Sequence, residues 1–183
     1  MATNTFHSAR LRGVASIPPA KSEAHRALLL AALGQAPCRL HGFPPPLCDD
    51  TQAMINGITA LGATVTVEDE VLLVSPAIVE TSSTEPVECE VHACAAALRM
   101  LIPAFLVRGR AVRFTMEDAL FARPLDAFLP LIAQLTARLI RTPSSEGRRA
   151  TVELRGVMPA GAYEIDGSLS SQFASGLLIA LTH

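Results

Sequence analysis

Apolar residues in this chain recur at two spacings, and each spacing predicts one type of element. Apolar positions three and four apart predict helices over residues 23–33, 52–61, 93–105, 124–135 and 171–181. Shorter alternating or continuous apolar runs predict strands over residues 11–17, 38–43, 64–67, 71–74, 111–115, 139–141 and 150–154. Residues 76–86 are polar and are interpreted as a connection.

Residues with known preferences at helix ends mark several of these boundaries. Ser22 is the predicted N-cap of the first helix, which ends at Gly34. Asp50 or Thr51 is expected to cap the second helix. Pro124 is expected to begin a later one, because its fixed φ suits the first turn of a helix.

The order of these elements indicates a repeat. Helix, strand, helix, strand, strand occurs twice, on a period of roughly seventy residues. We therefore expect one α/β domain built from repeated units. Its predicted parts are a lead-in over 1–16, a first unit over 17–80, a second over 87–155 and the start of a third over 163–183. The third copy stops after its first helix, so the chain is expected to be a piece of a longer protein.

The composition favours a globular protein with an aliphatic core. Half of the 183 residues are apolar, 17% are charged, Trp is absent and Tyr occurs once. A net charge of −2 argues against a nucleic-acid partner. The apolar runs are too short for a membrane span. No charged segment followed by an apolar one opens the chain, so we predict a cytoplasmic location.

The four cysteines raise the question of a metal site. Cys89 and Cys94 lie close to His92, and Cys38 and Cys48 lie close to a second histidine, His41. Neither group has the paired C-x-x-C spacing of a structural zinc site. We therefore predict reduced thiols and no bound metal.

Two predicted helix starts carry candidate binding chemistry. Lys21, Ser22 and Arg26 surround the first, and the hydroxyl-rich turn 167–172 opens the last. A helix N-terminus offers unpaired N–H groups and a partial positive charge, which suit phosphate or carboxylate. Taken singly, each motif is also what an ordinary helix cap looks like. Arg123 before Pro124 is similarly common at helix starts.

Taken together and in order, the motifs resemble a known family. Residues 19–26, Pro-Ala-Lys-Ser-Glu-Ala-His-Arg, are similar to the P-x-K-S-x-x-x-R signature of 5-enolpyruvylshikimate-3-phosphate (EPSP) synthases. Further matches follow in the family's order at Asp50-Thr51, 60–63 (Ala-Leu-Gly-Ala), 123–125 (Arg-Pro-Leu) and 165–173 (Ile-Asp-Gly-Ser-Leu-Ser-Ser-Gln-Phe). The resemblance covers nearly the whole chain but only the N-terminal part of the family's pattern.

The resemblance implies a fold, a reaction and a set of binding residues. The fold would be an inside-out α/β barrel-type domain of repeated βαβαββ units, with helices packed inside sheets. The reaction would transfer an enolpyruvyl group from phosphoenolpyruvate to shikimate 3-phosphate without a cofactor or metal. Shikimate 3-phosphate would be bound by Lys21, Ser22, Arg26, Ser170, Ser171 and Gln172. Phosphoenolpyruvate would be bound by Lys21, Arg123 and Gln172.

The chain also departs from the family's pattern. The family has Asn-x-Gly-Thr-Ala-x-Arg where residues 93–99 read Ala-Cys-Ala-Ala-Ala-Leu-Arg. A methyl group at Ala95 intrudes where glycine allows a close approach of the backbone to phosphoenolpyruvate. The family's proton-transfer carboxylates belong to a C-terminal domain that is missing here. We therefore name no catalytic residue and expect the chain alone to be inactive.

Two other functions stay open at this point. One is a non-catalytic shikimate-phosphate-binding remnant with a degenerate phosphoenolpyruvate subsite, suggested by the alanine run 93–97. The other is the related enolpyruvyl transferase that acts on UDP-N-acetylglucosamine. It is less favoured because Lys-Asn stands in that family where Lys21-Ser22 stands here.

Overall fold

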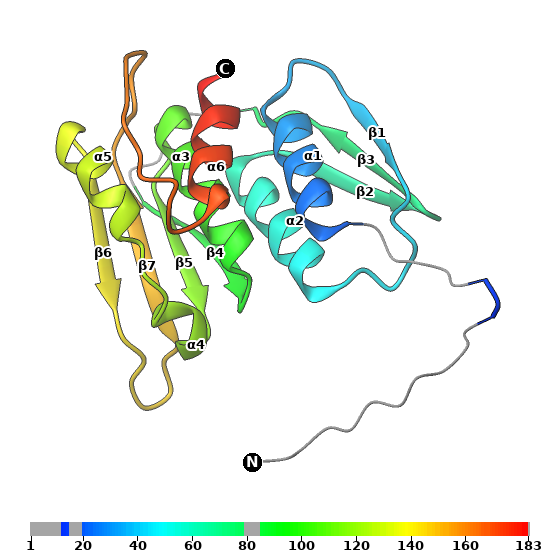
Figure 1. Cartoon of the computed structure of the whole chain (residues 1–183), viewed down its shortest axis with the longest axis horizontal. Coiled ribbons are helices and arrows are strands. Elements are labelled where there is room, and N and C mark those ends of the chain that lie inside the picture. The colour runs from blue at the N-terminus through cyan, green and yellow to red at the C-terminus, as the bar shows by residue number, and fades with distance from the viewer. Residues whose placement is uncertain (1–11, 15–19, 79–84, 183) are drawn as a thin grey trace.

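Four long helices and two small sheets make up the structure, a computed structural model that describes residues 12–14, 20–78 and 85–182 (Figure 1). The long helices are α1 (Lys21–Leu33), α2 (Asp49–Leu61), α3 (Ala95–Arg108) and α6 (Ser171–Leu181). Three shorter helical segments are α4 (Asp118–Phe121), the 3-10 turn η1 (Asp126–Phe128) and α5 (Leu129–Gln134).

The two sheets share part of their topology. The first contains β1 (Cys38–His41), β2 (Thr64–Glu68) and β3 (Val71–Ser75) in the antiparallel order β1-β3-β2. The second contains β4 (Val87–His92), β5 (Val112–Met116), β6 (Arg138–Thr142) and β7 (Ala150–Arg155). Its order is β4-β5-β7-β6, with β4 parallel to β5 and the other pairs antiparallel. The second sheet thus has a parallel edge strand that the described part of the first sheet lacks.

The long helices lie side by side between the two sheets (Figure 1). Helix α3 is apolar on nearly all sides and is buried on nearly all of them, which places it at the centre. Leu28 of α1, Met54 of α2, Leu98 of α3 and Phe173 of α6 belong to one continuous core. This is a mixed α/β fold in which helices rather than strands fill the middle.

Helices α3 and α6 approach each other unusually closely at a glycine. A Cβ atom added to Gly176 would lie 2.7 Å from Met100 Cα and 3.0 Å from the Arg99 carbonyl oxygen. Both neighbours are backbone atoms, so they cannot rotate away. The glycine therefore sets the separation of the two helices.

Several predicted elements are confirmed, with corrections at their ends. The last helix spans Ser171–Leu181 as predicted, and the strand pair predicted over 64–67 and 71–74 is the antiparallel pair β2 and β3. Helix α1 begins at Lys21 with Ala20 as N-cap, so the prediction of Ser22 as its cap is wrong. Cys48 occupies the N-cap position of α2, which places Asp50 and Thr51 inside the helix.

The segment after Pro124 is the largest error. The predicted helix over 124–135 is not continuous. Ala127 and Phe128 of η1 and Leu131 of α5 are buried, whereas Leu129 between them is exposed. The single predicted helix is therefore replaced by the 3-10 turn η1 followed by the short α-helix α5.

Three further differences concern one strand that was not predicted and the two ends of α3. Strand β4 was not predicted, although Val87, Cys89 and Val91 alternate with polar residues as a strand requires. Helix α3 begins at Ala95 rather than at residue 93, and it ends at Arg108 rather than at residue 105. The strand predicted over 11–17 falls largely outside the described residues, and the unit boundaries stay a prediction.

The described residues contain no helix long and apolar enough to cross a bilayer. In that same part of the chain, no group of three or more His, Cys, Asp or Glu side chains is arranged to hold a metal ion. All four cysteines are free thiols.

Candidate functional site

Side-chain contacts bring the N-terminal parts of all four long helices together. Lys21 of α1 contacts Asp50 of α2, and Arg26 of α1 contacts Ser175 of α6. Arg99 of α3 contacts Gln172 of α6. Residues distant in sequence, from both ends of the chain, therefore meet at one end of the helical layer.

Lys21 is exposed and forms an ion pair. Its Nζ donates to Asp50 Oδ2 at 2.9 Å. The hydrogen bond with Asp50 raises the pKa of Lys21, and in return it lowers the pKa of Asp50. Lys21 therefore stays an ammonium group, and its partner stays a carboxylate.

Arg26 joins the first helix to the last. Its Nη1 donates to the main-chain oxygen of Ser22 at 2.8 Å, and its Nη2 donates to Ser175 Oγ at 3.0 Å. Ser22 itself is exposed in the first turn of α1. The guanidinium is thus held near the α6 terminus, with part of its five-donor capacity unused by these two bonds.

The start of α6 is formed by a serine cap and a fixed glutamine. Ser170 Oγ accepts a hydrogen bond from the Gln172 main-chain nitrogen at 3.2 Å, as an N-cap does. Gln172 Oε1 accepts from Arg99 Nη1 at 3.1 Å. Ser171, between them in sequence, is exposed to solvent. The predicted residues of this turn are therefore placed together.

Arg99 was not among the predicted site residues. Its guanidinium lies 4.7 Å from the ring centroid of Phe173. Burial lowers the pKa of Arg99, and repulsion from the charge of Arg123 lowers it further. Within the described residues, neither arginine forms an ion pair with an acidic side chain. Arg99 is thus a partly buried positive charge beside the α6 terminus, and Arg123 lies close enough to repel it.

His25 connects α1 to α2 from inside the protein. Its side chain is 1% exposed, and its Nε2 lies 3.0 Å from the main-chain oxygen of Asp50. Because a carbonyl only accepts, Nε2 carries the proton and Nδ1 is the unprotonated nitrogen. Nδ1 is buried and has no hydrogen-bond partner within the described residues. The neutral imidazole therefore fixes the backbone that carries Asp50.

We expect His25 to make the stability pH-dependent. Burial lowers the pKa of His25 below its ordinary value of 6.5, so the unfolded chain binds the proton more readily than the folded one. The free energy of unfolding should therefore fall as the pH drops below about 6.5, with a slope approaching about 1.4 kcal/mol per pH unit. Urea titrations of the wild type and His25→Gln between pH 5 and 7.5 measure this slope.

The substitution should remove that slope. His41→Gln is the matched control, because His41 is exposed. An equal slope in the wild type and His25→Gln would show that other groups cause the pH dependence.

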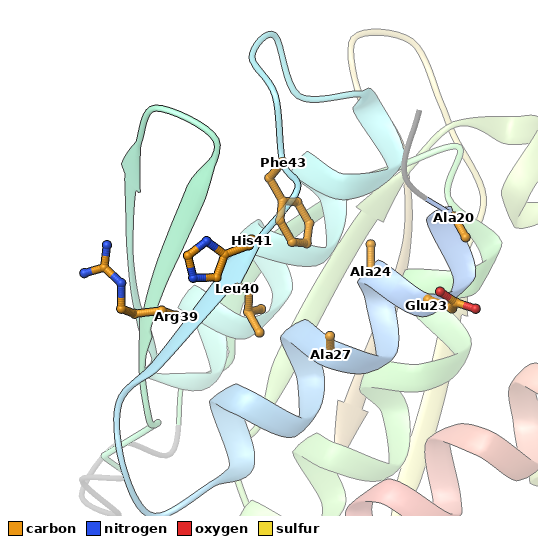
Figure 2. Close-up of a pocket in the computed structure, with 8 residues that line it drawn as sticks. All are labelled: Ala20, Glu23, Ala24, Ala27, Arg39, Leu40, His41 and Phe43. Carbon is orange, nitrogen blue, oxygen red and sulfur yellow. The ribbon is translucent and has the colours of Figure 1, made fainter. Parts of the chain in front are cut away.

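Two hollows lie next to α1, and only one contains a predicted site residue. Figure 2 shows a hollow of about 270 Å³ between α1 and β1, where Ala24, Ala27, Leu40 and Phe43 gather and Arg39 points outward. Its lining is mainly apolar and includes no predicted site residue. A second hollow of about 280 Å³ adjoins it, and Lys21 lies in its lining.

Comparison with known proteins decides the family. Residues 6–183 match the family model of EPSP synthase (3-phosphoshikimate 1-carboxyvinyltransferase). The chain belongs to the EPSP synthase family. The 3-phosphoshikimate 1-carboxyvinyltransferase of Clostridium perfringens (strain SM101 / Type A) is 30% identical over 173 residues, which are 94% of this chain and 39% of that protein. The Clostridium acetobutylicum protein of the same name is 31% identical over 173 residues, 93% of this chain and 39% of that protein.

Solved structures agree on the fold. An EPSP synthase from Acinetobacter baumannii superposes with a TM-score of 0.70 at 17% identity, over 92% of this chain and 37% of that one. The enolpyruvyl transferase NikO from Streptomyces tendae gives a TM-score of 0.51 at 16% identity, over 90% of this chain and 37% of that one. The chain thus spans about two fifths of the length of the EPSP synthases it matches.

The departure from the EPSP synthase pattern lies at the start of α3. Ala93 is exposed, whereas Ala95, at the position of the family's glycine, is buried. Cys94 is the N-cap of α3, and its Sγ accepts from the Ala97 main-chain nitrogen at 3.4 Å. Burial raises the pKa of Cys94 to about 11, so the cap is a neutral thiol. This helix terminus therefore offers a weaker set of polar groups than α6 does.

Proposed function

We propose that this chain supplies the N-terminal half of the binding site of an enolpyruvyl transferase. The substrates would be shikimate 3-phosphate and phosphoenolpyruvate. The 5-hydroxyl oxygen of the first would bond to C2 of the second, and phosphate would leave as the enolpyruvyl ether forms. The remaining part of the enzyme would supply the groups that move protons, so this chain alone would be inactive.

The observation that carries the proposal is the meeting of Arg26, Arg99 and Gln172 at the α6 terminus. Arginine side chains only donate hydrogen bonds, and they bind phosphate and carboxylate well. The N-terminus of α6 adds unpaired N–H groups with a partial positive charge. A ligand with a phosphate group and a carboxylate matches these donors.

The proposed roles follow the family's motifs. Shikimate 3-phosphate would be held by Lys21, Ser22, Arg26, Ser170, Ser171 and Gln172, and phosphoenolpyruvate by Lys21, Arg123 and Gln172. The units over 17–80, 87–155 and 163–183 would form an inside-out barrel-type domain, in the cytoplasm. Catalysis of this kind rests on positioning and electrostatic stabilisation, for which the proposed residues are suited.

A second candidate is a shikimate-phosphate-binding protein that does not catalyse. The methyl groups of Ala95 and Ala96 favour it, because they stand where the family has glycine and threonine. Turnover by the full-length protein with both substrates separates the two candidates. A protein that binds shikimate 3-phosphate but forms no product would support the second one.

Both candidate functions require the chain to bind shikimate 3-phosphate. Calorimetric titration of the isolated chain with this ligand tests that requirement. We expect weak binding, reduced about tenfold or more in Arg26→Ala, because a charge-assisted hydrogen bond contributes about 1.5–3 kcal/mol. Ser171→Ala should reduce the affinity by a smaller factor, because it removes an uncharged hydroxyl.

Arg138→Ala is the matched control, since it removes an exposed arginine on β6. It should bind like the wild type. Equal binding heats for the wild type, Arg26→Ala and Ser171→Ala would contradict the assignment of these residues to the site.

A further inference from the structure

Gln172 is held by hydrogen bonds at its main chain and at its side chain. Its main-chain nitrogen donates to Ser170 Oγ, and its side-chain oxygen accepts from Arg99 Nη1. Arg99 is itself held against the ring of Phe173, the residue that follows Gln172. Side-chain rotation of Gln172 is therefore restricted by a contact from a different helix.

The chemistry of the Arg99 contact decides which way the amide faces. A guanidinium has five N–H donors and no acceptor, so only the oxygen of the Gln172 amide can bond to it. The NH₂ group of Gln172 must then point away from Arg99. Over residues 20–78 and 85–182, no hydrogen bond engages Gln172 Nε2.

We propose that Arg99 is a positioning residue that sets the specificity of the α6 terminus by turning the NH₂ group of Gln172 toward the ligand. The inference rests on the proposed function, because Gln172 is one of its binding residues. With the amide fixed in this way, the Gln172 side chain presents only its NH₂ donors, and it therefore favours a phosphate or carboxylate, which only accepts. A Gln172 that could rotate would also offer its oxygen to the ligand and lose that preference.

The nearby charges support this orientation. Arg123 lies close enough to lower the pKa of the partly buried Arg99, although burial has the larger effect. Two guanidinium groups with no acidic partner among the described residues leave a positive field at the α6 terminus. An anion placed there is attracted by both charges and meets the NH₂ group of Gln172.

The first experiment needs no ligand. Melting temperatures are measured for the wild type, Arg99→Met, Gln172→Glu and the double variant, which together form a double-mutant cycle. With Arg99 present, Gln172→Glu replaces the hydrogen bond by an ion pair and should leave the melting temperature equal or higher. In the Arg99→Met background, the same change should lower it. Absence of coupling would overturn the contact, and with it the proposal.

The second experiment measures affinity for shikimate 3-phosphate by calorimetry. Arg99→Met should bind about tenfold more weakly, and Arg99→Lys should recover part of the loss, because an ammonium also only donates. Gln172→Glu should bind more weakly than Gln172→Met, since a carboxylate oxygen then faces the anion. A merely structural Arg99 would not produce this order, because Gln172→Glu is expected to leave the fold as stable as the wild type.

The control is Arg138→Met, which removes the same charge from an exposed position on β6. Wild-type affinity in Arg99→Met, or a loss equal to that of Arg138→Met, would overturn the proposal and leave the proposed function standing. A wild-type chain without any affinity for shikimate 3-phosphate would instead contradict the proposed function. In that case the melting-temperature cycle would still test whether Arg99 holds the Gln172 amide, without reference to a ligand.

Discussion

Gly176→Val is expected to lower the free energy of unfolding by about 3 kcal/mol or more. The new side chain would begin 2.7 Å from Met100 Cα and 3.0 Å from the Arg99 carbonyl oxygen, and both are backbone atoms. Side-chain rotation cannot relieve such a contact, so α6 must move away from α3. Urea denaturation followed by circular dichroism measures the loss.

Gly176→Ala provides the sharper version of this test. In an exposed helix, glycine to alanine stabilises by up to about 1 kcal/mol. Here the added methyl group is itself the clashing atom, so we expect destabilisation instead. Gly167→Ala is the control, because its Cβ would meet only Ala174 Cβ at 3.8 Å, an ordinary contact. A Gly176→Ala chain as stable as the wild type would show that the two helices can separate at little cost.

The same glycine links stability to the proposed binding site. Gly176 follows Ser175, which contacts Arg26, and it packs against the backbone of Arg99, which contacts Gln172. A displaced α6 would therefore lengthen both contacts. Gly176→Ala should lose affinity for shikimate 3-phosphate even under conditions where it is still folded.

Local patterns in the sequence were sufficient for elements whose ends are set locally. The limits of α6 follow from the Ser170 cap and the apolar run after it, and the structure agrees. Ser22 failed as a cap because Ala20 already has the extended conformation that starts α1. The segment after Pro124 failed because spacing alone does not separate a 3-10 turn from an α-helix when only a few residues are buried.

Residues of the candidate site could be predicted from the sequence only where they belong to a recognised motif. Lys21, Arg26 and Gln172 were predicted, and the structure places them at the helix starts, with Arg26 and Gln172 in contact with neighbouring helices. Arg99 was passed over, although it matches the arginine of the family's Asn-x-Gly-Thr-Ala-x-Arg pattern. Its role depends on a contact with a residue 73 positions away, which no local pattern encodes.

Phe173→Ala is expected to cost about 3–5 kcal/mol of unfolding free energy. The ring is completely buried and packs edge-on against Phe128, with ring centroids 4.9 Å apart. Its loss would leave a cavity in the core between α6 and η1, and it would remove the surface on which Arg99 lies. Thermal and urea denaturation measure the cost.

Phe173→Leu distinguishes the effect of the ring on core packing from its effect on ligand binding. Leucine fills much of the volume but has no aromatic face, so the cation–π contact with Arg99 is lost while the chain stays folded. Phe114→Leu is the matched control: Phe114 is equally buried and stacks edge-on with Phe105 at 5.5 Å. Both variants should lose similar stability. Only Phe173→Leu should weaken binding of shikimate 3-phosphate, by a few-fold, because a cation–π contact contributes about 0.5–2 kcal/mol. Equal affinities in the two variants would show that Arg99 holds Gln172 without help from the ring.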